Sequence, residues 1–354
     1  MAALVAIGNG AGTVVQVGVN SSLARKVGHY LPASAVSFLG GTFLLLTING
    51  AAAVALWRQQ KLRPMKWEGL QIWELCGGMI GAATLSASVS LSPYLGFATG
   101  ATITSAGQVF SSLLVDHFGL LGIPRRRLTA PRIAGAGLVL GGCAGSALDL
   151  ALRSGPSVAK ATLSPLMTLL MGTLYLLIRM GQPVQTCINR RLSERLPLPS
   201  MAAVVSFAMG SLVVCSSCAA LFLRQPHLWR AFRAGFRFPA ASTAGITAAT
   251  VAVGDGMAWW MPLGGAFGAI EVTSAVLLSP RIGAAAYYNC KTAGQLLWSL
   301  WQDTTGAFGY QQRTMTLSRV VCVVMTLVGS ILTRLDFGSN TARAPKEQNN
   351  TIDR

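Results

Sequence analysis

The chain contains two copies of one sequence unit, and this internal repeat limits its possible folds more than any other feature. When residues 73–142 are shifted by 187 positions onto residues 260–329, about a third of the positions are identical. A second block aligns without a gap at a shift of 169 positions. Identical pairs in this block include Gln16 and Gln185, Asn20 and Asn189, Ser37 and Ser206, and Phe38 and Phe207. We therefore expect two similar structural units.

Each copy is made of apolar runs that are long enough to cross a bilayer. The runs 33–57 and 201–223 contain no charged residue, and a spanning helix needs about 20 apolar residues. The expected spans are 3–20, 33–57, 70–91, 95–115, 131–150, 163–184, 198–223, 257–278, 282–302 and 318–335. The sequence thus predicts an all-α integral membrane protein with about ten transmembrane helices, five in each copy.

An odd number of spans in each copy has a topological consequence. The second copy enters the membrane from the opposite side, so the repeats are predicted to be inverted, as in many secondary transporters. We expect a first five-helix repeat at 1–155, a second at 156–338 with an insertion near 224–256, and a polar tail at 339–354. If the apolar stretch 240–256 also spans, the count becomes eleven and the inversion is lost. We favour a surface or re-entrant segment there, because the first copy has no equivalent.

The charge balance also favours a membrane protein. Hydrophobic residues make up 52% of the chain and charged residues 11%, whereas a soluble chain carries about 25% charged residues. The excess of 28 Lys and Arg over 11 Asp and Glu is typical of basic loops beside membrane spans. We expect no nucleic-acid partner, because no soluble domain with interleaved basic and aromatic residues is visible.

Enzyme chemistry is disfavoured by the distribution of the reactive residues. The three histidines, His29, His117 and His227, are scattered, and the chain has no HExxH motif, nucleophile elbow or glycine-rich phosphate loop. We therefore expect no catalytic residue, no metal site and no cofactor.

Amide side chains inside the expected spans are the candidates for substrate binding. Polar groups within a membrane span cost free energy unless they are satisfied, which makes them functional candidates. Gln16 and Asn20 lie four residues apart, so they share one helix face. The six candidates are Gln16, Asn20, Gln108, Gln185, Asn189 and Gln295. The alternative is that these amides only tie neighbouring helices together.

A pair of opposite charges distinguishes the second copy from the first. Glu271 and Lys291 lie on either side of Pro280 in successive spans, each about 14–17 Å from the turn, so the two should be level with each other. Their counterparts in the first copy are Thr84 and Thr104. A salt bridge is the simplest interpretation. The sharper hypothesis is that Glu271 exchanges a proton or binds a cation, while Lys291 tunes Glu271 or receives an anionic group.

Other polar residues near span ends have simpler interpretations. We expect Arg179 to extend its side chain to the membrane interface and Glu74 to be interfacial. Asp116 and Asp303 should cap helices or pair with nearby arginines. Pro183 is expected to interrupt its helix and free backbone carbonyls.

Two sequence runs resemble a known transporter family. One contains Gly181, Gln182, Pro183, Val184, Gln185, Ile188, Asn189 and Leu192, and the other is Ala106-Gly107-Gln108 followed by Leu113 to Gly122, with Gly294-Gln295 as its repeat. They resemble the drug/metabolite transporter (DMT) superfamily, in particular its YdcZ-type inner-membrane exporters, in two tandem copies. The resemblance covers nearly the whole chain and implies a ten-helix exporter fold, alternating access, and a location in the plasma or inner membrane.

The function expected from these features is secondary transport or export of a small metabolite or drug-like solute. The expected partners are a small-molecule substrate and the lipid bilayer, with protons as the hypothetical coupling ion. The alternative is a membrane protein of another kind: a scramblase, a channel or a structural subunit.

Overall fold

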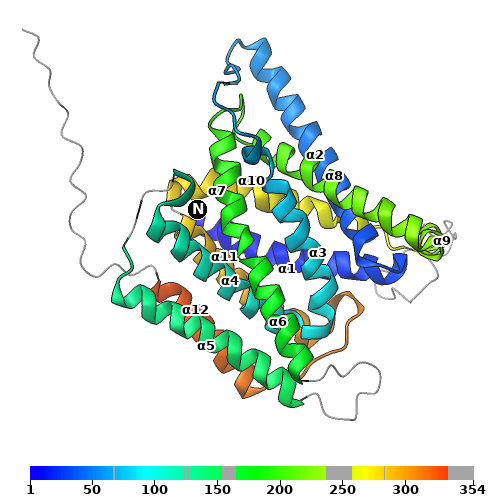
Figure 1. The fold of residues 1–354 in the computed structure, drawn as a ribbon, viewed down its shortest axis with the longest axis vertical. Coiled ribbons are helices and arrows are strands. Elements are labelled where there is room, and N and C mark those ends of the chain that lie inside the picture. The colour runs from blue at the N-terminus through cyan, green and yellow to red at the C-terminus, as the bar shows by residue number, and fades with distance from the viewer. Residues whose placement is uncertain are drawn as a thin grey trace, which may run out of the picture.

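The computed structural model describes residues 1–66, 68–122, 125, 127–153, 165–236, 257–282 and 284–333, and these residues form helices and connecting segments without any β-strand (Figure 1). Several sequence expectations lie outside the described residues. These are the apolar stretch 240–256, the polar tail 339–354 and the boundary between the two repeats at residues 155 and 156.

The helices follow the same order in both copies, except that the second copy has one extra helix and has two helices where the first copy has its first helix. The first copy contains α1 (Ala2–Val27), α2 (Tyr30–Arg58), η1 (Ile72–Leu75), α3 (Gly77–Leu95), α4 (Phe97–Phe118), η2 (Leu120–Gly122) and α5 (Ala130–Arg153). The second contains α6 (Pro165–Arg179), α7 (Gly181–Ser193), α8 (Met201–Arg224), α9 (Pro226–Gly235), η3 (Met261–Leu263), α10 (Gly264–Ile282), α11 (Ala284–Thr305), η4 (Ala307–Gly309) and α12 (Leu317–Leu332). The extra helix, α9, falls in the expected insertion.

The expected span 163–184 differs from the others because it forms two helices. α6 ends at Arg179 and α7 begins at Gly181 and runs to Ser193, well beyond the expected end. Pro183 lies in the first turn of α7, where its missing N–H leaves no intrahelical hydrogen bond unmade. Pro183 is therefore compatible with the start of a new helix. Arg179, the last residue of α6, lies in the middle of the combined α6–α7 segment.

Six helical segments of the described chain are long and apolar enough to cross a membrane by length and composition. They are α1, α2, η1 with α3, α5, α8, and η3 with α10. α4 and α11 have 22 residues each but contain buried polar side chains such as Gln108 and Lys291. A helix enclosed by other helices can carry such residues because its polar face points into the bundle.

The same close helix contacts occur twice, between helices of different copies. A Cβ atom added to Gly78 of α3 would lie 1.9 Å from the carbonyl oxygen of Ser206 in α8. At the matching position in α10, a Cβ on Gly265 would lie 2.0 Å from the carbonyl oxygen of Ser37 in α2. α2 and α8 also pack against each other, as do α5 and α12, which run side by side in Figure 1. The two copies are therefore interlocked along several helices.

We predict that Gly78→Ala and Gly265→Ala destabilise the protein, because each new methyl group would overlap a backbone carbonyl of the neighbouring helix. Overpacking of this kind costs about 1–3 kcal/mol. Thermal unfolding of the purified protein in detergent, followed by circular dichroism, should give lower melting temperatures for both variants. Gly137→Ala is the matched control, because a Cβ at Gly137 would have no neighbour within 4 Å. Melting temperatures equal to that of the control would contradict the close packing.

Candidate functional site

A central cavity of about 490 Å³ lies between helices of the two copies. Its walls come from α1, α2 and α3 of the first copy and from α6, α7, α8 and α10 of the second. The polar side chains that line it are Thr13, Gln16, Thr84, Ser88, Arg179, Gln182, Gln185 and Glu271. The apolar part of the wall includes Phe38 and Phe207, whose ring centroids lie 5.2 Å apart.

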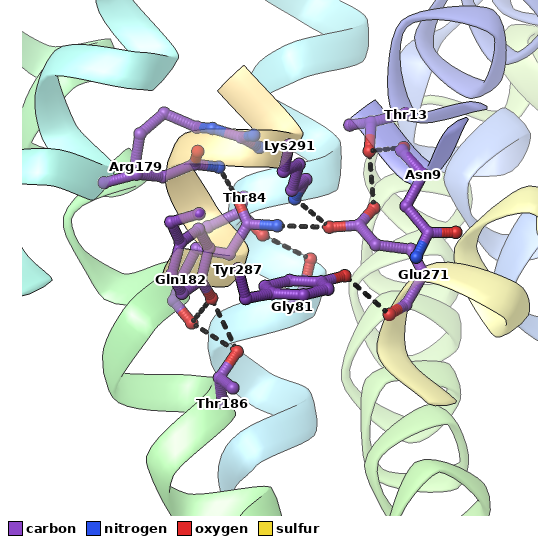
Figure 2. Close-up of polar contacts among 12 residues, drawn as sticks. Asn9, Thr13, Gly81, Thr84, Arg179, Gln182, Thr186, Glu271, Tyr287 and Lys291 are labelled. Carbon is purple, nitrogen blue, oxygen red and sulfur yellow. Dashed lines mark hydrogen bonds and ion pairs between the residues drawn. The ribbon is translucent and has the colours of Figure 1, made fainter. Parts of the chain in front are cut away.

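Glu271 is the centre of the polar contacts at this cavity. Its carboxylate forms an ion pair with Lys291 and accepts hydrogen bonds from Gln182 Nε2 at 2.5 Å and from Thr13 Oγ1 at 3.0 Å (Figure 2). Glu271 is 8% exposed and Lys291 is fully buried. The salt bridge expected from the sequence spacing is therefore present, and both carboxylate oxygens have donors.

Tyrosine and glutamine side chains hold the helices around this pair. Gln108 Nε2 donates to Gln182 Oε1 at 2.7 Å, which connects α4 through Gln182 to Glu271. Tyr287 OH donates to the backbone carbonyl of Glu271 at 3.4 Å, and Tyr288 OH donates to that of Gln182 at 3.1 Å. The carbonyl of Gln182, beside Pro183, thus serves as an acceptor for another helix.

The expectation for Arg179 is wrong. Arg179 is only 4% exposed, lines the central cavity and donates from Nη1 to Ser88 Oγ at 3.1 Å. Its Nε is buried and has no hydrogen-bond partner among the described residues. The expected interface location assumed that the span ended near residue 184. Because α7 continues to Ser193, Arg179 lies in mid-segment and cannot extend to the interface.

The six amide candidates have different environments. Gln16 and Gln185 line the central cavity, Gln295 lines a second cavity of about 300 Å³, and Asn189 lines a third of about 270 Å³. Gln108 contacts Gln182. Asn20 lines none of these three cavities, whose walls are built from described residues.

Three of these amides also tie helices together within their own copy, and one of them is Gln185, whose Nε2 donates to Ser206 Oγ at 3.3 Å. Asn20 Nδ2 donates to Ser37 Oγ at 3.0 Å, and Asn189 Nδ2 donates to Ser206 Oγ at 3.2 Å. The alternative interpretation, in which the amides link helices, therefore describes Asn20. Gln185 and Asn189 combine such a link with a place on a cavity wall.

Four cavities share lining residues and so form a row. The third cavity shares Gln182 and Glu271 with the central one, which shares Thr13 and Arg179 with the second. The second shares Phe97 with a fourth cavity of about 620 Å³. The row therefore passes the charged side chains of Glu271 and Arg179, which together with Lys291 we call the charged cluster.

The fourth cavity lies at the end of the row, between the ends of α1, α3, α4 and α11 and the segment that contains Tyr310 and Arg313. It is lined by polar and aromatic side chains that include Arg25, Asp303, Tyr310 and Arg313. The rings of Phe97 and Tyr310 meet edge to face, with centroids 5.0 Å apart. Burial lowers the pKa of Arg313 from its ordinary value, and the nearby Asp303 carboxylate acts in the opposite direction. The Phe97 ring thus lines both the second and the fourth cavity, and Tyr310 packs against it from the fourth.

Three other acidic residues that the sequence pointed to have structural contacts away from the central cavity. Asp303 accepts from the backbone N–H groups of Phe97 at 2.9 Å and Ala98 at 3.0 Å, which caps the start of α4. Asp116 lies 3.8 Å from Arg132. These contacts confirm the expectation of a cap or an arginine partner. Glu74 is fully buried and pairs with two arginines, Arg191 at 2.8 Å and Arg195 at 2.7 Å.

Sequence reasoning did not select Thr13, Gln182 or Arg179 as site residues. A usable signal was present in the comparison of the two copies, because these positions differ between them. Thr13 corresponds to Gln182, and Arg179 corresponds to Gly10. Positions at which the repeat diverges lie around the cavity, together with Glu271.

Comparison with known proteins gives the family. A family model described as "Putative inner membrane exporter, YdcZ" matches residues 1–145 and 170–332. A solved structure titled "Crystal structure of protein" is similar to this chain with a TM-score of 0.51 and 17% sequence identity, and the match covers 92% of this chain and 95% of that chain. At this identity the likeness shows the fold alone. No curated protein matches the chain. With its several apolar helices and a family match over most of its length, the chain belongs to the YdcZ family of inner-membrane exporters and is a multi-pass membrane protein.

Proposed function

We propose that the chain is a secondary exporter that moves a small solute by alternating access between two inverted five-helix repeats. The observation that carries this proposal is the central charged cavity, which is walled by matching positions of both copies. Gln16 corresponds to Gln185 in the repeat alignment, and Thr84 of α3 corresponds to Glu271 of α10. In transporters built from inverted repeats, the substrate site lies near the membrane midplane at the interface of the repeats.

Contacts between connecting segments support the ten-span inverted topology. With ten spans, the segments after α2 and α7 lie on one side of the membrane, and the backbone N–H of Lys66 donates to the carbonyl of Arg195 at 2.9 Å. The segments between α3 and α4 and between α11 and α12 then lie on the other side. There, Arg313 Nη1 donates to the carbonyl of Leu95 at 3.2 Å. Both contacts join segments that this topology places together.

The close glycine contacts give the helices a way to move without opening large gaps. Gly10 of α1 faces the carbonyl of Lys291 in α11, and Gly107 of α4 faces the carbonyl of Leu176 in α6. Helices that meet at small residues approach each other closely. In our proposal, these contacts allow one set of helices to rock against the other around the central cavity.

Glu271 is the proposed coupling residue. Protonation would remove its negative charge and release Lys291 from the ion pair, which changes the contact between α10 and α11. A ligand changes a conformational equilibrium only by binding the two states differently. A proton on Glu271 meets this condition if only one of the two states keeps the ion pair.

Glu271→Gln should abolish transport driven by a pH gradient while leaving gradient-free exchange of solute across the membrane, because the amide has nearly the size of the carboxylate and keeps one acceptor oxygen but cannot titrate. The measurement uses liposomes containing the purified protein and an internal pH-sensitive dye, screened with a panel of small solutes. Glu194→Gln, at an exposed carboxylate paired with Arg190, is the matched control. Solute-driven proton flux that survives in Glu271→Gln would contradict the coupling role. Flux of labelled lipid alone would favour a scramblase instead.

Lys291→Met should abolish transport and lower stability, because it leaves the Glu271 carboxylate buried without its cation. Removing one partner of a buried ion pair costs about 3–5 kcal/mol. The double variant Glu271→Gln/Lys291→Met removes both charges and should recover most of the lost stability. Unfolding in detergent compares the three proteins, and membrane fractionation checks that Lys291→Met still inserts. Equal destabilisation of the single and double variants would show that the pair does not act as a unit.

A further inference from the structure

We propose that the central cavity takes a solute that carries one oxyanion group, a carboxylate or a phosphate, and that Arg179 binds this group. The inference rests on the proposed function, because it names the class of substrate for the same cavity.

The charged cluster has one more cation than it has carboxylates. Glu271 is paired with Lys291, and Arg179 contacts no carboxylate among the residues that the structure describes. A buried charge without a partner costs several kcal/mol, and ionisable residues inside membrane bundles mark substrate or ion pathways. An anion bound in the cavity would supply the partner that Arg179 lacks.

Arg179 has donors left for such a ligand. A guanidinium has five N–H donors in a planar fork, and Arg179 uses Nη1 for Ser88 Oγ at 3.1 Å. Its Nε is buried without a partner in the described part of the chain, and the side chain lines both the central and the second cavity. The fork geometry matches carboxylate and phosphate oxygens, which Arg often binds through two parallel hydrogen bonds.

A cationic solute has no comparable acceptor in the cluster. Oε1 of Glu271 already accepts from Lys291 and Gln182, and Oε2 accepts from Thr13. A cation at the acceptor site left on Oε2 would lie close to two cations, Lys291 and Arg179, and to a single carboxylate. The carboxylate of the cluster thus already accepts three hydrogen bonds, whereas Arg179 has an N–H donor without a partner among the described residues, so the site favours an anion.

The two copies differ in a way that limits the site to one anionic group. The repeat counterpart of Arg179 is Gly10, and a Cβ on Gly10 would lie 2.0 Å from the carbonyl oxygen of Lys291. No side chain fits there, so the first copy cannot supply a second arginine. The amide of Gln16 and the amide oxygen of Gln185, whose Nε2 donates to Ser206, line the cavity beside the uncharged part of the solute.

The test is binding of matched probes to the full-length purified protein in detergent, measured by thermal shift and calorimetry. Benzoate, benzamide and benzylamine share one ring and differ in charge, and inorganic phosphate and chloride complete the set. Benzoate, phosphate or both should stabilise the wild-type protein, whereas benzamide and benzylamine should not. Benzoate alone would indicate an organic carboxylate, and phosphate alone a phosphate group. Binding of chloride alone, of the amide or amine alone, or of no probe would overturn the proposal.

Variants of Arg179 test whether this side chain binds the anion. Arg179→Gln should weaken anion binding by roughly tenfold or more, since a hydrogen bond to a charged group contributes about 1.5–3 kcal/mol, and Arg179→Lys should weaken it less. Arg190→Gln, at an arginine of α7 that pairs with exposed Glu194, should bind as the wild type does. Unchanged affinity in Arg179→Gln would overturn the assignment.

A measurement on the wild-type protein covers the case in which Arg179→Gln fails to fold. Phenylglyoxal modifies accessible arginines, and mass spectrometry reports the extent at each one. The anion that binds should protect Arg179 from modification and leave Arg190 unaffected. Equal modification of Arg179 with and without the anion would contradict the proposal.

Transport in liposomes separates this inference from the proposed function. If the protein exchanges only neutral or cationic solutes, the exporter function stands and the anion site is wrong. If an oxyanion binds through Arg179 but no solute crosses the membrane, the anion site stands and the exporter function is wrong.

Discussion

Burial of Glu271 and Lys291 in the middle of the helix bundle sets the conditions that the surrounding helices have to meet. Removing a carboxylate and an ammonium from water costs several kcal/mol for each ion, and only good geometry with additional hydrogen bonds offsets this cost. The ion pair joins α10 to α11, and the donors Gln182 and Thr13 bring α7 and α1 to the same carboxylate. One ion pair thus fixes how four helices from both copies meet (Figure 2).

The two copies share their packing residues and differ in their chemistry. Gly78 and Gly265, with their partners Ser206 and Ser37, make the same close contact twice. By contrast, Thr84 stands in the first copy where the second has Glu271. The result is a nearly symmetric scaffold around an asymmetric site. A nearly symmetric helix scaffold suits a protein with two alternative conformations of similar energy. The residues that differ between the copies give the cavity a single charged cluster.

Much of the fold follows from the sequence because spans are set by local hydrophobicity and length. The ion pair was also predictable, since Glu271 and Lys291 lie at similar distances from the turn at Pro280. The buried position of Arg179 could not be predicted in this way. The apolar pattern does not show that one helix, α6, ends at Arg179 and that a second and more polar helix, α7, follows it. Likewise, Gln16 and Asn20 share a helix face, yet one lines the cavity and the other binds Ser37. Such differences depend on neighbouring helices, which helix periodicity does not specify.

The central claim is that the cavity opens alternately to the two sides of the membrane. It is tested most directly with Thr84→Cys, at a cavity-lining residue, in a variant whose seven native cysteines are replaced. A membrane-impermeant maleimide is added to one side of oriented vesicles at a time. If the cavity alternates, the new cysteine reacts from both sides, and a transported solute or a change of pH raises one reaction rate as it lowers the other. Reaction from one side only under all of these conditions would contradict it.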